Sequence, residues 1–128
     1  MSGAEISLRV PGKQEYVLVI RTALGGVAVL KDLNVDALDD LRMAADEACD
    51  CLLHQGRPVS TITLQVQDLG KSLTVSLEAD FEGECRQECE DMTAISKAVL
   101  ETLVPQVEMR QCDCGCIQRI DMLLPKAV

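Results

Sequence analysis

The sequence predicts a two-layer α/β sandwich, in which three helices cover one face of a mixed, mostly antiparallel sheet of four to five strands. Three observations predict this α+β class. The expected elements run β-α-α-β-β-α-β-β, the later strands form two adjacent hairpins, and the helices are segregated from them. The 128 residues suffice for a single domain over 1–128, and with only 2% aromatic residues its core must be aliphatic.

The first part of the chain predicts a strand and two helices. “EISLRV” alternates apolar and polar side chains, as a half-buried strand does. Apolar residues recur at helical spacing over 13–31. Gly25 and Gly26 lie inside this helix, where glycine costs about 1 kcal/mol relative to alanine, so they predict a close packing contact. A second helix is predicted over 36–54, with Asp36 as its N-cap.

The second part predicts two hairpins joined by a helix. The residues “TITLQVQDLGKSLTVSLEA” (61–79) alternate on both sides of a Leu-Gly turn, which indicates a hairpin. A third helix over 92–104 stops before a proline. Two further strands, 107–111 and 117–124, flank the turn “CDCGC”.

Charge and hydropathy exclude several classes of partner. The formal net charge is −9, from 21 acidic and 12 basic residues without a Lys/Arg cluster. Such a surface repels nucleic acid and anionic membranes, and it favours a protein partner with a basic patch. No apolar run reaches the roughly 20 residues of a membrane span. The start “MSGAEISLRV” has neither a basic leader nor an apolar segment, so we expect a cytoplasmic protein.

Seven cysteines stand out in a chain expected in a reducing compartment: Cys49, Cys51, Cys85, Cys89, Cys112, Cys114 and Cys116. An odd number argues against a complete disulfide framework, and the first interpretation is reduced thiols that pack as small hydrophobes. Alternatively, the three cysteines of “CDCGC” cluster as a metal or redox site, to which Cys85 and Cys89 would add ligands.

Longer segments carry a resemblance to a known family. “VPGKQEYVLVIRTALGGVA” and “LDDLRMAADEAC” are similar to the opening of the bacterial anti-sigma-factor serine kinases of the partner-switching type, and “ETLVPQVE” resembles their “ETLMDEVE”. These kinases belong to the GHKL ATPases, which include histidine kinase catalytic domains. The resemblance covers essentially the whole chain. It implies the GHKL fold, Mg-ATP as cofactor, a sigma factor and an anti-anti-sigma factor as partners, and a homodimer.

The resemblance places a catalytic Glu and a magnesium-binding Asn four residues apart on the second helix. Glu47 matches the Glu, which polarises the attacking hydroxyl as a general base. Cys51 occupies the position of the Asn. Because magnesium prefers hard oxygen ligands, a thiol is a poor substitute.

Two further family motifs are also altered. The D-x-G-x-G motif, whose Asp holds adenine, corresponds to residues 79–83 and keeps only Gly83; a shift of one residue restores Asp80 but no glycine. The G-x-G motif that cradles the triphosphate corresponds to “AIS”, which ends at Ser96. The segment between them is acidic, which opposes triphosphate binding: Glu82, Glu84, Glu88, Glu90 and Asp91.

These changes favour a regulatory binding protein without bound cofactor, in which ATP binding is lost or impaired. Arg21 matches a family residue that contacts the partners, although it could also be an ordinary solvated arginine. One alternative is an active ATP-dependent protein serine kinase with Glu47 as its base. A second is a metal- or thiol-linked sensor on the same scaffold. Glu47, Cys51 and His54 also share a helical stripe, where His54 either caps the helix or adds a metal ligand.

Overall fold

The computed structural model describes residues 5–83 and 93–126, and its elements follow the predicted order. They are β1 (Ile6–Pro11), the 3-10 turn η1 (Gln14–Tyr16), α1 (Val17–Leu30), α2 (Val35–Leu53), β2 (Val59–Asp68), β3 (Ser72–Phe81), α3 (Thr93–Leu103), β4 (Gln106–Gln111) and β5 (Ile117–Pro125). The two predicted hairpins are therefore β2–β3 and β4–β5.

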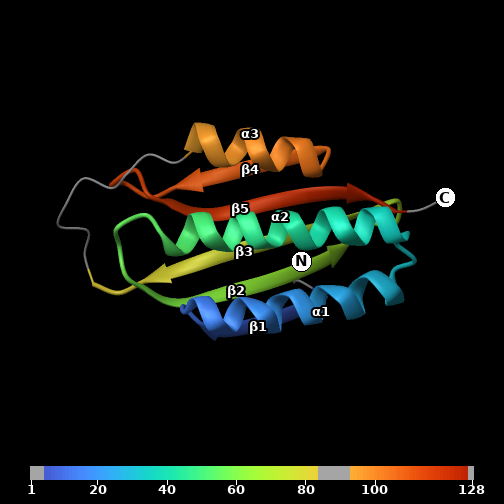
Figure 1. The fold of residues 1–128 in the computed structure, drawn as a ribbon, viewed down its shortest axis with the longest axis horizontal. Coiled ribbons are helices and arrows are strands. Elements are labelled where there is room, and N and C mark those ends of the chain that lie inside the picture. Colours follow the sequence, from blue (N-terminus) through green and yellow to red (C-terminus); the bar gives the residue numbers. More distant parts are fainter. Residues whose placement is uncertain (1–4, 84–92, 127–128) are drawn as a thin grey trace.

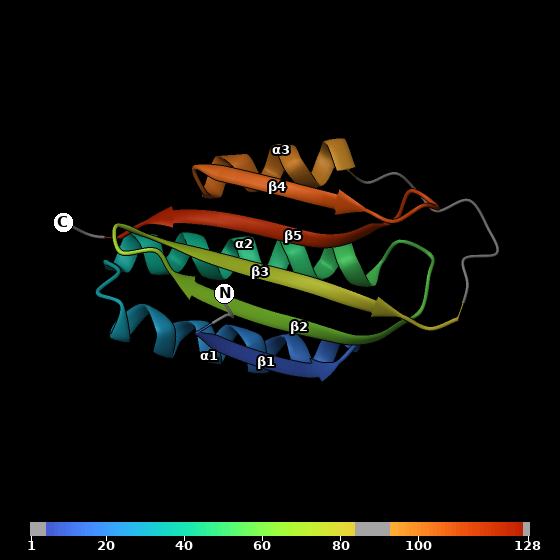
Figure 2. The ribbon, with the colours of Figure 1, turned by 180° about the vertical axis from the view of Figure 1, so that it is seen from behind.

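The five strands form one sheet in the order β1-β2-β3-β5-β4, and the three helices cover one of its faces (Figures 1 and 2). The two-layer α+β prediction is confirmed. The expectation of a mixed sheet is wrong, because every pairing between the described strands is antiparallel. The connection from β3 through α3 to β4 would favour parallel neighbours, but β5 lies between these two strands and is antiparallel to both.

The core between sheet and helices is aliphatic, as the composition predicts. Alternate residues of the central strands face the helices and are buried: Ile62, Leu64 and Val66 on β2, Leu73, Val75, Leu77 and Ala79 on β3, and Ile120 and Met122 on β5. The central helix α2 lies between α1 and α3 over this surface (Figure 1). Among the helices within residues 5–83 and 93–126, none combines the length and the hydropathy of a membrane-spanning segment.

The first turn of α2 is capped by Asn34 and not by Asp36. The Asn34 side chain accepts a hydrogen bond from the Ala37 amide at 2.7 Å. Asp36 lies one residue inside the helix, where its charge faces the positive end of the helix dipole. The prediction of Asp36 as N-cap is therefore wrong, since the helix begins earlier than the apolar pattern indicates.

The two glycines of α1 have different surroundings. A Cβ atom at Gly25 would lie 2.9 Å from the Arg42 guanidinium on α2, whereas a Cβ atom at Gly26 would meet nothing within 4 Å. The predicted close contact is therefore present at Gly25, where it involves the end of a flexible arginine side chain that can shift. It is absent at Gly26, which is exposed.

Asp68 joins three separate parts of the chain at one end of the sandwich. Its carboxylate lies 2.6 Å from Lys126 Nζ and 3.2 Å from Lys31 Nζ, and it accepts the Gly70 amide at 2.8 Å. Lys31 also binds Glu5 at 2.8 Å. The hydrogen bond from Lys126, followed by those from Gly70 and Lys31, lowers the pKa of Asp68 below its usual range.

This lowered pKa makes an acid-dependent contribution to stability. A carboxyl group whose pKa is lowered by folding stabilises the folded state above its unfolded pKa of about 3.9, and this stabilisation is lost as the pH falls. Asp68→Asn retains the shape of the side chain but removes its charge. We expect thermal melts to show a lower midpoint for Asp68→Asn than for wild type at pH 7, and a smaller difference at pH 3.

Asp39→Asn, at an exposed position of α2, is the matched control and should change the midpoint little at either pH. An equal difference between wild type and Asp68→Asn at both pH values would contradict the assigned role of Asp68.

Candidate functional site

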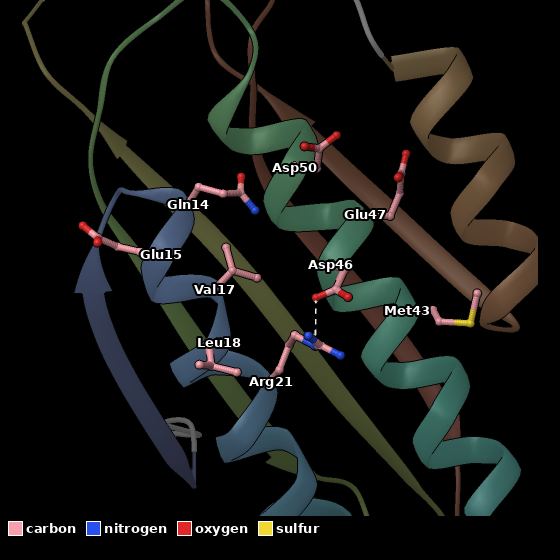
Figure 3. A pocket seen from close by; sticks show the side chains of 9 residues that line it. All are labelled: Gln14, Glu15, Val17, Leu18, Arg21, Met43, Asp46, Glu47 and Asp50. Carbon is pink, nitrogen blue, oxygen red and sulfur yellow. Dashed lines mark ion pairs between the residues drawn. The ribbon is translucent and has the colours of Figure 1, made fainter.

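A groove of about 640 Å³ lies between η1, α1 and α2, and we call it the acidic groove (Figure 3). The residues that line it are Gln14, Glu15, Val17, Leu18, Arg21, Met43, Asp46, Glu47 and Asp50. Four of them are carboxylates and one is an arginine. The groove therefore suits a ligand or partner that presents cationic groups together with an acceptor for the arginine.

Arg21 extends from α1 across this groove to Asp46 on α2 (Figure 3). Its Nε lies 3.2 Å from Asp46 Oδ1, and the two side chains are 45% and 44% exposed. The contact lacks hydrogen-bond alignment, since Asp46 Oδ1 has no hydrogen-bond partner among the described residues. A half-exposed ion pair of this kind contributes less than about 1 kcal/mol. Asp46 therefore holds Arg21 only weakly.

Glu47 leaves α2 on the side away from Arg21 (Figure 3). It is partly buried, and this desolvation, followed by the charge of Asp50, raises the pKa of Glu47. A carboxylate with a raised pKa is suited to accept a proton. Glu47 is the residue at which the resemblance places a general base, and its pKa is shifted in the direction that such a role would require.

Cys51 and Ser96, which belong to two different motifs, meet between α2 and α3. Their side chains form a hydrogen bond, and the residues are only 2% and 1% exposed. Burial raises the pKa of the Cys51 thiol, and the hydrogen bond from Ser96 only partly opposes this. A buried protonated thiol does not fit the hard oxygen ligand that magnesium requires at this position.

The structure does not bring Asp80 to the same region. Asp80 is exposed and accepts a hydrogen bond from Thr61 Oγ1 at 3.0 Å, whereas its neighbour Ala79 is buried beneath the helices. Successive strand residues face opposite sides of a sheet. The shift in alignment that restores Asp80 therefore places its carboxylate on the uncovered face. Gly83 has a φ of +64° and lies in the bend after β3.

Among the described residues, Glu47, Cys51 and His54 do not form a metal site on α2. His54 is the C-cap of α2, and its amide donates to the Asp50 carbonyl at 3.1 Å. Its exposed ring lies 3.4 Å from Asp50 Oδ1 and 3.1 Å from Gln14 Oε1. Because Cys51 is buried while His54 is exposed, they do not converge on one ion, and the capping interpretation of His54 is confirmed.

The cysteines of “CDCGC” do converge. The sulfur atoms of Cys112, Cys114 and Cys116 lie within 4.8 Å of one another. Cys112 and Cys114 are thiols with their sulfurs 2.8 Å apart. Cys116 is disulfide-bonded, and its partner lies outside the described residues. The prediction of reduced cysteines is thus wrong for Cys116, and a disulfide sulfur cannot serve as a thiolate ligand for a metal.

Arg57 is a functional candidate that the sequence did not reveal. Its Nη1 donates to the sulfurs of Cys112 and Cys114, each at 3.6 Å, and its Nη2 donates to the Gly83 carbonyl at 2.9 Å. The guanidinium also lies 4.5 Å from the ring centre of Phe81. These hydrogen-bond partners are 26 to 57 residues away in sequence, so no local spacing could have indicated them.

Two sets of predicted features lie outside the described residues. Cys85 and Cys89 belong to the segment 84–92. So do the acidic residues predicted to oppose a triphosphate, except Glu82, which is exposed after β3.

Comparisons with known proteins support the resemblance, although no family model matches the chain. The anti-sigma-F factor RsbW of Mycobacterium tuberculosis (strain H37Rv) is 32% identical over 74 residues, which cover 58% of this chain and 44% of that protein. The serine-protein kinase RsbW of Bacillus subtilis (strain 168) is 43% identical over 44 residues, or 34% of this chain and 28% of that protein. The chain thus spans less than half the length of these relatives.

A solved structure confirms the fold. The chain that holds the RsbU and RsbW domains of a Mycobacterium tuberculosis protein aligns with 94% of this chain at a TM-score of 0.67. The alignment covers 32% of that chain, and the sequence identity is 11%. The resemblance to the partner-switching kinases is therefore confirmed, by relatives that carry their names and by a shared fold.

The buried cysteines of α2 should react slowly in the native state. Burial, followed by the charges of Asp46 and Asp50, raises the pKa of the Cys49 thiol to about 12, and burial also raises that of Cys51. Since the thiolate is the nucleophile, we expect iodoacetamide to label Cys51 at least about a hundredfold more slowly than Cys112. Timed quenching of the reduced, desalted protein followed by peptide mass spectrometry measures both rates.

In guanidinium chloride the two rates should become similar, which provides the control. Equal rates in the native protein would contradict the closed packing of α2 against α3.

Proposed function

We propose that the chain is a cytoplasmic, anti-sigma-factor-like regulatory protein that binds a sigma factor or an anti-anti-sigma partner, with ATP binding lost or impaired. The buried contact between Cys51 and Ser96 is the observation that carries the second part. These residues stand where the family has its magnesium ligand and a phosphate-binding glycine. The names of the sequence relatives support the first part.

Packing between α2 and α3 supports the loss of nucleotide binding. A magnesium nucleotide would need an oxygen ligand where the Cys51 thiol is buried, and bare backbone where Ser96 fills space. It would also need an acceptor for the adenine amino group, but Ala79 supplies none and Asp80 faces the other side of the sheet. Three independent deficiencies each weaken binding, so correcting one of them does not restore it.

The acidic groove supports partner binding through α1. Leu18 and Met43 line it and are 64% and 57% exposed, so an apolar surface flanks Arg21. An arginine beside apolar contacts at an interface centre contributes about 2 kcal/mol or more, whereas an arginine at the rim contributes far less. In this proposal a carboxylate of the partner replaces Asp46 as the counterion of Arg21, and the homodimer implied by the resemblance remains part of the proposal.

If nucleotide binding is lost, neither the native chain nor a variant with one restored position should bind Mg-ADP. Isothermal titration with Mg-ADP should show no binding in the micromolar range, either for the native chain or for Cys51→Asn. The variant restores the magnesium ligand but leaves Ser96 and Ala79 unchanged. A micromolar dissociation constant for the native chain would overturn the proposal, and recovery in Cys51→Asn alone would show that a single position limits binding.

The partner proposal predicts a ranking of variants in binding to the purified sigma factors and anti-anti-sigma proteins of the native organism. Arg21→Ala should weaken binding at least about tenfold, the loss of about 1.4 kcal/mol that an interface arginine can supply. Asp46→Asn should leave binding unchanged or strengthen it, because it releases Arg21 from its internal counterion. Surface plasmon resonance measures the dissociation constants.

Arg9→Ala, at an exposed position of β1, is the control and should bind as the native chain does. Equal losses in Arg21→Ala and Asp46→Asn would indicate that the ion pair is only structural.

The raised pKa of Glu47 favours one alternative, an active protein serine kinase in which Glu47 is the base. In that case Glu47→Ala would abolish phosphate transfer to the anti-anti-sigma partner. In the binding proposal the same variant should leave the dissociation constant nearly unchanged.

A further inference from the structure

We propose that Cys112 and Cys114 form a reversible dithiol–disulfide site that exchanges with low-molecular-weight disulfides and is positioned by Arg57. This site lies in the β4–β5 turn, apart from the acidic groove.

The geometry of the turn brings the two sulfurs together. They are 2.8 Å apart, which is about 0.8 Å more than a disulfide bond of ~2.05 Å. The turn is held by hydrogen bonds from the Cys112 amide to the Cys116 carbonyl at 2.8 Å and from the Gly115 amide to the Cys112 carbonyl at 3.0 Å. Gly115 has a φ of +96°, which an L side chain rarely adopts. Bond formation between the sulfurs therefore requires only a small movement.

Arg57 fixes these sulfurs from a different part of the chain. One of its nitrogens donates to both sulfurs, while the other donates to the Gly83 carbonyl and the guanidinium stacks on Phe81. Gly83 and Phe81, which both lie outside the turn, thus hold the Arg57 guanidinium in place. Reactive cysteines are found beside arginine, lysine or protonated histidine. Cys112 and Cys114 are also partly exposed, unlike Cys49 and Cys51 in the core.

The positive charge of Arg57 favours binding of an anionic disulfide over binding of a metal ion at these cysteines. A fixed guanidinium hydrogen-bonded to two sulfurs repels a metal cation at that point, and the disulfide at Cys116 removes one of the three possible ligands. A small disulfide that carries carboxylates, such as oxidised glutathione, is instead attracted by the cation.

The exchange balances in two steps. One sulfur of the pair, as thiolate, attacks a sulfur of the small disulfide, whose S–S bond breaks to release one small thiolate. The second cysteine, as thiolate, then attacks the protein sulfur of this mixed disulfide, forms the Cys112–Cys114 bond and releases the second small thiolate. Both released thiolates take up the protons lost by the cysteines. The protein loses two electrons, and the small disulfide gains them.

The test uses the full chain, purified without oxygen and equilibrated with buffers of increasing oxidised-glutathione content. After an acid quench and alkylation, mass spectrometry examines the tryptic peptide 111–119, which contains all three cysteines of the turn. Cys116→Ser isolates the pair from its disulfide-bonded neighbour. In this variant we expect the peptide to lose two hydrogens and both alkyl groups at Cys112 and Cys114. Cys112→Ser and Cys114→Ser should instead accumulate the mixed disulfide with glutathione.

Arg57→Gln tests the positioning role and should slow oxidation about tenfold at the same buffer composition, as expected when a cation is removed from a reactive cysteine. Arg9→Gln, which removes an exposed arginine on β1 without altering the peptide 111–119, is the matched control and should oxidise at the native rate. Circular dichroism verifies that each variant is folded. Arg57→Lys retains the charge without the planar fork and should recover part of the rate.

Two results would overturn the proposal. One is a pair that remains doubly alkylated at the highest oxidised-glutathione content. The other is stoichiometric binding of Zn²⁺ to the reduced chain that protects Cys112 and Cys114 from oxidation, which would indicate a metal site.

Discussion

The close packing of α2 on the sheet is the constraint on which the rest of the molecule depends. Its buried face carries small side chains, Ala44, Ala45, Ala48 and Cys49, all fully buried, so the helix axis can approach the aliphatic surface of the strands. The helix is then fixed beyond its C-terminus by Gln55. This buried amide donates to the Ile117 carbonyl at 2.8 Å and accepts the Ile117 amide at 2.6 Å, as a strand neighbour would.

From this fixed position, α2 has two different sides. Toward α1 it presents Asp46 to Arg21 in an open groove whose ion pair is half exposed. Toward α3 it presents Cys51 to Ser96 in a contact almost closed to solvent. The side that faces α1, where we propose that a partner binds, is accessible to solvent. The side that faces α3, where a nucleotide would bind in the family, is closely packed. This asymmetry is the physical basis for separating partner binding from ATP binding in the proposed function.

The cysteines show how the environment decides the chemistry of identical side chains. On α2, burial and neighbouring carboxylates keep Cys49 protonated, and it acts as a small apolar residue. In the β4–β5 turn, Cys112 and Cys114 are partly exposed and accept hydrogen bonds from Arg57. The prediction that the cysteines are reduced thiols packed as small apolar residues is thus correct for Cys49 and Cys51 on the helix, but it is wrong for Cys116 in the turn.

The sequence by itself determined the element order, the aliphatic core and the two hairpins, because these follow from periods of two and 3.6 residues that are local in the chain. The resemblance to the partner-switching kinases likewise placed Glu47 and Cys51 at the positions of the family's Glu and Asn, and their spacing of four residues placed them on one face of a helix. Only the tertiary structure decided that β5 separates β3 from β4, that Ser96 covers Cys51, and that Arg57 reaches the cysteines of the turn. Each of these depends on residues far apart in sequence, whose contact is set by how the layers pack and leaves no periodic signal in the chain.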